Sequence, residues 1–173
     1  MTFSAKKFAT AVALSVLASS PFLASAASNG YKMVLIEDTP GADTIQAGEL
    51  EQGIKEVTTS LSLDADGFSR SMALCVAYSR LGQLAQAEAS CNSAVNQART
   101  YASAPRAIKR EMRALAFSNR GVMHLLAGNR VAALEDFKQA VSIDKNDISV
   151  ANLERLTASI NGVALQQYAF HAE

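Results

Sequence analysis

Two stretches, LCVAYSRLG at residues 74–82 and FSNRGVMHLLAG at residues 117–128, each end in a glycine and can be laid over each other. Small residues follow both glycines at the fifth and twelfth positions, and a larger apolar residue follows at the ninth: Ala87, Ala94 and Cys91 in the first copy, Ala133, Ala140 and Phe137 in the second. Small residues let two helices approach closely, and larger ones fill the space beside the crossing. The pattern therefore predicts two helical hairpins that turn at Gly82 and Gly128, because glycine tolerates the backbone angles of a tight turn.

This pattern resembles the tetratricopeptide repeat (TPR), a helix–turn–helix unit of about 34 residues with the signature W-x-x-L-G-x-x-Y, A-x-x-x-F and P. The chain departs from the signature in three ways: Ser71 stands where the first aromatic residue is usual, Arg120 stands where leucine is usual, and no proline ends either copy. The resemblance implies an all-α fold, in which antiparallel helical hairpins stack as a short right-handed solenoid. It also implies a binding surface rather than an active site.

A third, partial copy lies upstream, because Gly48 precedes Gly82 by one repeat length and is followed by small or medium residues at the same three positions. The turn sequence Thr39-Pro40-Gly41 disfavours a helix before it, so we expect only the second half of this unit. The predicted domain covers residues 44–160 and consists of a half repeat at 44–61, repeats at 67–101 and 105–146, and a capping helix at 147–160 that Asn161-Gly162 stops. The predicted helices of these units span 44–61, 67–81, 84–101, 105–127, 131–143 and 147–160. Residues 161–173 form a tail.

The start of the chain, residues 1–26, has the layout of a secretory signal peptide. Lys6 and Lys7 give a positive start, an apolar stretch follows, and Ala24-Ser25-Ala26 supplies small residues for cleavage. The alternative is an uncleaved membrane anchor, but Pro21 and scattered serines interrupt the apolar run, which must reach about 20 residues to span a bilayer. We therefore expect an exported protein, periplasmic or secreted, whose mature chain begins with an extended arm at residues 27–43. Its apolar run, residues 31–36, is expected to lie against the first helix, and the alternative is a partner-binding tail.

The composition of the mature chain excludes several partner classes. Removing the signal takes away two of the sixteen basic residues and none of the sixteen acidic ones, so the net charge becomes about −2. No basic excess is left to bind phosphates, and nucleic acid is not an expected partner. No other apolar stretch is long enough to span a membrane. The remaining length suits one compact domain.

No catalytic constellation is visible in the sequence. It contains neither a glycine-rich phosphate loop, nor a His/Cys/Asp cluster with metal-ligand spacing, nor a nucleophilic serine turn. His124 occupies an aromatic position of the repeat pattern, which favours a packing role over that of a general base. We therefore expect a protein without enzymatic activity, cofactor or metal.

The expected function is that of a scaffold that binds another protein, or an extended peptide, in the groove of its stacked helices. In TPR proteins the first helix of each unit lines the concave face. Carried onto this chain, the resemblance implies that the partner-binding residues are Met72, Val76, Ser79, Arg80, Ser118, Asn119, Val122 and Leu125. The alternative is an accessory or catalytic domain of an envelope enzyme system, with a small-ligand pocket near the arm and His124.

The two cysteines lie at equal distances from the first predicted turn. Cys75 precedes Gln83 by eight residues and Cys91 follows it by eight, so antiparallel helices place them at the same height. A disulfide needs Cα atoms within about 7 Å, whereas helix axes usually pack about 8–10 Å apart. Close crossing at small residues makes up this difference, and an oxidising compartment favours the bond. The alternative is a pair of buried thiols that act as small apolar fillers.

Overall fold

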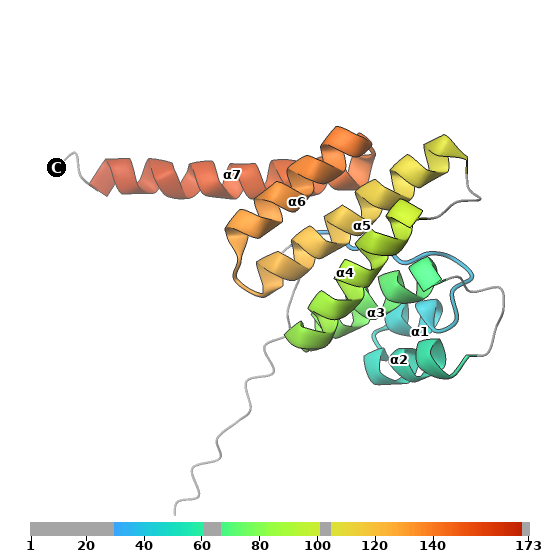
Figure 1. Cartoon of the computed structure of the whole chain (residues 1–173). Helices are drawn as coiled ribbons and strands as arrows, with labels where there is room; N and C mark the ends of the chain where they lie inside the picture. Colours follow the sequence, from blue (N-terminus) through green and yellow to red (C-terminus); the bar gives the residue numbers. More distant parts are fainter. Residues whose placement is uncertain (1–29, 61–66, 101–104, 171–173) are drawn as a thin grey trace, which may run out of the picture.

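The computed structural model describes residues 30–60, 67–100 and 105–170, with residues 163–170 as backbone only. Within these ranges every regular element is an α-helix, so the predicted all-α class is confirmed for the described residues (Figure 1). The helices are α1 (Ala42–Ala47), α2 (Leu50–Thr59), α3 (Gly67–Leu81), α4 (Leu84–Thr100), α5 (Arg106–Leu126), α6 (Arg130–Ile143) and α7 (Asp147–Phe170). The bounds of α3 to α6 agree with the predicted helices to within one residue at either end. The predicted signal peptide at 1–26 lies outside the described residues.

Three glycines build the same turn at three places in the chain. Gly48, Gly82 and Gly128 have φ values of 97°, 71° and 79°, in the left-handed region that favours glycine. At each turn the glycine N–H donates to the carbonyl three residues back, and the next N–H donates to the carbonyl five residues back. This bond pair is the Schellman motif, which satisfies the last carbonyls of a helix. The following helix begins two residues after each glycine, so the three turns share one geometry.

The prediction of one helix over residues 44–61 is wrong. Gly48 divides this segment into α1 and α2, and a six-residue helix fits between Gly41 and Gly48 despite the turn sequence before it. The two helices fold against each other because Gly53 of α2 lies directly against the fully buried side chain of Ile45 in α1, where a Cβ atom would have no room. The partial copy therefore has a short first helix, which the proline and glycine did not prevent.

The prediction that the last helix stops at Asn161-Gly162 is also wrong, because α7 continues to Phe170. A glycine inside a helix costs about 1 kcal/mol relative to alanine and does not forbid helical angles. A Cβ atom at Gly162 would meet nothing within 4 Å, so no neighbour among the described residues forces the chain to turn there. The second half of α7 consequently runs beyond the other helices (Figure 1).

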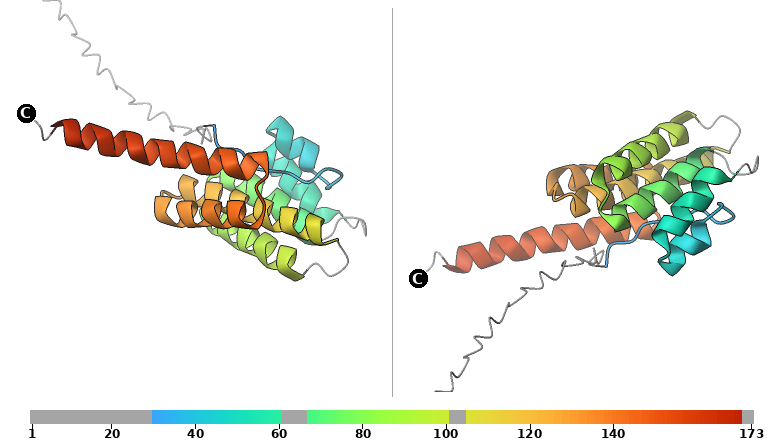
Figure 2. Two further views of the ribbon diagram at one scale, coloured as in Figure 1. Left: turned by 90° about the horizontal axis from the view of Figure 1, so that it is seen from above. Right: turned by 90° about the horizontal axis from the view of Figure 1, so that it is seen from below.

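The core is formed where the hairpin α3–α4 packs against the hairpin α5–α6, with α1 and α2 against α3 and with α7 against α5 and α6. Phe68, Met72 and Phe137 are among its largest fully buried side chains. The segment before α1, residues 30–41, has no regular secondary structure apart from turns. Figure 2 shows this segment running along one face of the helices, from beside α7 to α1.

Candidate functional site

The face formed by the first helices of the two hairpins and by α7 holds residues 31–37, which belong to the predicted extended segment at 27–43. We reserve the name arm for these seven residues. Two asparagines bind its backbone. Asn119 of α5 accepts the Val34 N–H through Oδ1 at 2.8 Å and donates to the Val34 carbonyl through Nδ2 at 2.8 Å. Asn152 of α7 makes the same two bonds with Lys32, at 2.9 Å and 2.8 Å. Residues two apart in an extended chain direct their backbone groups to the same side, so the two asparagines form hydrogen bonds with the same backbone edge of the arm.

Both side-chain amides are held firmly in place. Asn119 and Asn152 are 0% and 1% exposed. Asn152 Nδ2 also donates to the buried Ser118 Oγ at 2.9 Å, and Asn119 Nδ2 lies 3.7 Å from Met72 Sδ. A buried amide left without partners would cost about 1–3 kcal/mol for each polar group. These asparagines therefore require an extended backbone, or an equivalent set of polar groups, opposite them.

The arm's apolar side chains pack in two alternating sets. Met33 and Leu35 lie against the cluster around Ile45 and Val76, while Val34 and Ile36 lie against the cluster around Phe68 and Met72. Tyr31 stacks against Phe137 with ring centroids 6.0 Å apart. The Lys32 side chain is exposed. The arm is thus bound through its backbone on one edge and through apolar contacts on both faces.

The eight residues predicted to bind a partner lie on α3 and α5, but six of them are buried: Met72, Val76, Ser79, Ser118, Asn119 and Val122. They therefore form no open groove, because the arm binds Asn119 and packs against the clusters that contain Met72, Val76 and Val122. Arg80 is exposed and donates to the Ile45 carbonyl at 2.6 Å, which ties α3 to α1. Leu125 is half-buried and borders a cavity. Their role in binding a partner stays a prediction.

Sequence reasoning missed Asn152, which belongs to the helix interpreted as a cap. Its separation from Asn119 is close to the repeat length, and this spacing was a usable signal. The sequence favoured an extended segment tucked against the first helix, and Met33 and Leu35 do pack against the cluster that contains Ile45 of α1 and Val57 of α2. The sequence did not indicate that the arm also crosses the face of α3, α5 and α7, where its polar contacts are with α5 and α7.

A cavity of about 920 Å³ opens at the start of the arm, between α5 and α7. Its apolar wall includes Tyr31, Leu125 and Leu126, and its charged rim includes Arg130, Glu154 and Arg155. The Arg155 guanidinium lies over the Tyr31 ring, 5.9 Å from its centroid. The alternative sequence interpretation placed a small-ligand pocket beside the arm and His124. The cavity does adjoin the arm, but His124 is not part of its lining.

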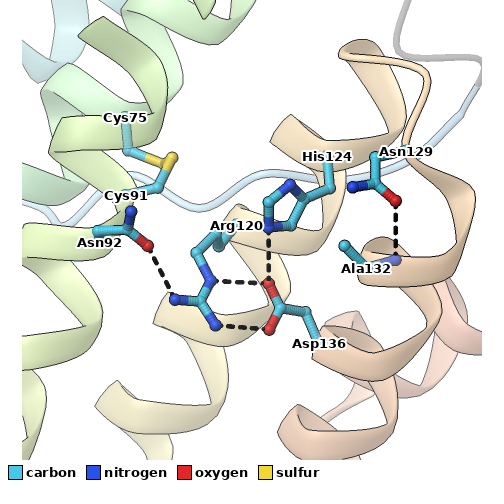
Figure 3. A network of polar contacts seen from close by, with 8 residues as sticks. All are labelled: Cys75, Cys91, Asn92, Arg120, His124, Asn129, Ala132 and Asp136. Atoms are coloured by element: carbon cyan, nitrogen blue, oxygen red, sulfur yellow. Dashed lines mark hydrogen bonds and ion pairs between the residues drawn. A yellow bond between two sulfur atoms is a disulfide. The ribbon is translucent and has the colours of Figure 1, made fainter. Parts of the chain in front are cut away.

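A disulfide joins the two helices of the first hairpin, α3 and α4. Cys75 of α3 and Cys91 of α4 form a disulfide with Cα atoms 4.7 Å apart, and both cysteines are fully buried (Figure 3). The structure thus pairs the cysteines as predicted and confirms the close crossing. Met33 of the arm packs against the cluster that contains this disulfide.

An ion-pair network joins α4, α5 and α6 beside the disulfide (Figure 3). Arg120 binds Asp136 through two hydrogen bonds, of 2.8 Å and 2.7 Å, and donates to Asn92 Oδ1 at 2.8 Å. The hydrogen bonds to Asp136 raise the pKa of the Arg120 guanidinium, which partial burial lowers less strongly. His124 lies 3.7 Å from Asp136, mostly buried, so it occupies a packing position in this network. Such a two-bond pair fixes side-chain geometry and suits a structural role.

The described residues contain no group of three or more histidine, cysteine or acidic side chains placed to hold a metal ion. None of the helices described here has the length and apolar character needed to cross a membrane. Comparison with protein-family models, with curated proteins and with solved structures finds no match for this chain.

Proposed function

We propose that this chain is an exported, non-enzymatic scaffold of the TPR type, which binds an extended segment of another protein on the face that carries Asn119 and Asn152. The two-bond contacts of these asparagines with an extended backbone are the observation that carries the proposal. Side-chain amides that bind main-chain N–H and C=O groups accept almost any sequence, as strand addition does. The face is thus suited to a polypeptide rather than to a small molecule.

The glycine turns support the TPR part of the proposal. Gly48, Gly82 and Gly128 each join two helices through the same bonds, and a small residue lies five positions after each glycine. Export is supported by the layout of residues 1–26 and by the disulfide, since such bonds persist in oxidising compartments. The protein partner remains the predicted ligand class, and no cofactor is part of the proposal.

The test uses the full mature chain with its arm loosened. Lys32→Pro with Val34→Pro removes the two N–H groups that Asn152 and Asn119 accept, because proline has no backbone donor. The matched control, Lys32→Ala with Val34→Ala, truncates the same side chains and keeps both N–H groups. A fluorescent peptide with the sequence of residues 30–38 is then titrated into each protein, and its anisotropy is followed.

We expect the proline variant to bind this peptide saturably and at least 10-fold more tightly than the alanine control. A scrambled peptide of the same composition should bind more weakly, because its apolar residues no longer stand at matching positions. If the folded proline variant shows no saturable binding of the native peptide, the face is not a peptide-binding site and the proposed function is wrong.

A further inference from the structure

We propose that the arm is a replaceable occupant of the asparagine face, and that the partner is an extended segment with large apolar residues at alternate positions, matching Tyr31, Met33 and Leu35. This inference rests on the proposed function and specifies it. It names the chemistry of the partner segment and the contact that keeps the face closed until the partner arrives.

The arm is held by two kinds of contact, main-chain hydrogen bonds and apolar side-chain packing. The hydrogen bonds that Asn119 and Asn152 make with residues 32 and 34 involve main-chain atoms of the arm, so they do not depend on which residues stand there. A different segment in the same extended conformation would satisfy Asn119 and Asn152 equally well. The polar contacts of the face therefore allow one extended segment to replace another.

Selectivity among partner segments must therefore come from the apolar positions. Tyr31 stacks on Phe137, and Met33 packs against three of the four apolar clusters of the described core. Leu35 packs beside Met33 against the cluster around Val76. These three side chains lie two residues apart along the arm, while the Lys32 side chain between the first two is exposed. A matching partner segment needs large apolar residues at these three positions and tolerates any residue opposite Lys32. It also needs apolar residues opposite Val34 and Ile36, which pack against the cluster around Phe68 and Met72.

The two ends of the arm also lie in different surroundings. At its C-terminal end the arm enters a tight turn in which Asp38 and Gly41 have φ values of 62° and 80°, and this turn leads directly into α1. At its other end Gly30 and Tyr31 border the cavity of about 920 Å³. An incoming segment can occupy this cavity first, beside Tyr31, and then replace the arm residue by residue toward α1.

Exchange must compete with the covalent attachment of the arm. A short tether gives the arm an effective concentration of the order of millimolar, so an identical free peptide binds the closed protein much more weakly than the open one. A natural partner overcomes this difference through the additional contacts that the cavity offers. The closed state therefore selects against isolated short peptides.

Two measurements on the full mature chain test the exchange itself. In hydrogen exchange of the wild type, the amides of Lys32 and Val34 should exchange at least 10-fold faster than buried amides in the middle of α5, because the arm opens without global unfolding. In titrations with the labelled peptide of residues 30–38, the wild type should bind at least 10-fold more weakly than the variant with Lys32→Pro and Val34→Pro. Equal exchange rates in the arm and in α5 would make the arm a permanent part of the core and overturn the inference.

Peptide variants test the alternation. Serine in place of Tyr31, Met33 and Leu35 in the peptide should weaken its binding to the proline variant at least 10-fold, whereas serine in place of Lys32 should change it less than 2-fold. If the native and the triple-serine peptides bind equally tightly, the proposed function is unaffected, but the stated chemistry of the partner segment is wrong. If the proline variant binds the native peptide no better than the wild type does, the arm does not compete and the exchange falls.

Discussion

The hairpins α3–α4 and α5–α6 hold equivalent positions together by different chemistry. Cys75 lies seven residues before Gly82 and Cys91 nine after it, and in the second hairpin the same positions relative to Gly128 are Gly121 and Phe137. The first pair is a disulfide. In the second pair, a Cβ atom added to Gly121 would lie 2.6 Å from the Phe137 ring, so the ring occupies the space above the glycine. A covalent bond joins α3 and α4 where they cross, whereas α5 and α6 meet there through the Phe137 ring packed on Gly121.

The difference extends to the neighbouring positions. Arg120 and Asp136 form the two-bond ion pair across α5 and α6, and the equivalent positions in the first hairpin are Leu74 and Ser90. The second hairpin thus combines a ring contact with an ion pair, whereas the first has the disulfide. The spacing of small residues around the two glycines therefore sets how closely two helices cross, whereas different side chains can make the contact at the crossing.

The largest effect should come from removing the ring. Phe137→Ala deletes a fully buried side chain that packs on Gly121 and stacks with Tyr31 of the arm. We expect the free energy of unfolding to fall by about 3–5 kcal/mol, the usual cost of truncating a buried phenylalanine. Urea unfolding followed by circular dichroism measures this change.

A second substitution in the same crossing serves as the control. Gly121→Ala in the wild type should be destabilising, because its methyl group would overlap the Phe137 ring. In the Phe137→Ala background the same change should be neutral or stabilising, since the ring is gone and alanine is the better helix former. Equal effects in both backgrounds would contradict the ring-on-glycine contact.

The next largest effect should come from removing the disulfide between α3 and α4. Cys75→Ala with Cys91→Ala removes a cross-link that closes a loop of about 15 residues, which is worth about 3 kcal/mol in the loop-entropy model. We expect urea unfolding to show a loss of this size, and a reducing agent should destabilise the wild type but leave the variant unchanged. Two thiols that react with an alkylating reagent in unfolded, unreduced wild type would show instead that the cysteines are free.

The crossings were largely predictable from sequence because they depend on local spacing. The glycine positions give the turns, and the residues at fixed distances from Gly82 and Gly128 give the contacts, including the cysteine pair. The position of the arm was not predictable in this way. Tyr31 and Phe137, or Lys32 and Asn152, are more than a hundred residues apart, and no local pattern links them.

The same limit applies to the expected groove. The resemblance assigned one side of the helices to a partner, and this side carries Met72, Val76, Ser118 and Asn119. The sequence alone did not show that a segment from the start of the chain would cover it.

The predicted end of the last helix was wrong for a different reason. Asn161-Gly162 is a frequent stop signal, but it ends a helix when the chain has a reason to turn, and the described surroundings of Gly162 supply none.

The smallest effect should come from replacing the turn glycines. These substitutions test whether the turns of the two hairpins are energetically equivalent although the contacts between their helices differ. Gly82 and Gly128 both have positive φ, and a Cβ atom added to either would meet nothing within 4 Å. Alanine at these positions therefore adds no clash, and its cost is the left-handed backbone itself, about 1–2 kcal/mol. We expect Gly82→Ala and Gly128→Ala to lower the free energy of unfolding by the same amount within about 0.5 kcal/mol, as measured by urea unfolding. Asparagine at either position should recover part of the loss, because it tolerates left-handed angles better than alanine. A cost at one turn that is several times the cost at the other would show that the disulfide or the ion pair alters the turn, and the two hairpins would then differ in more than the chemistry of their crossings.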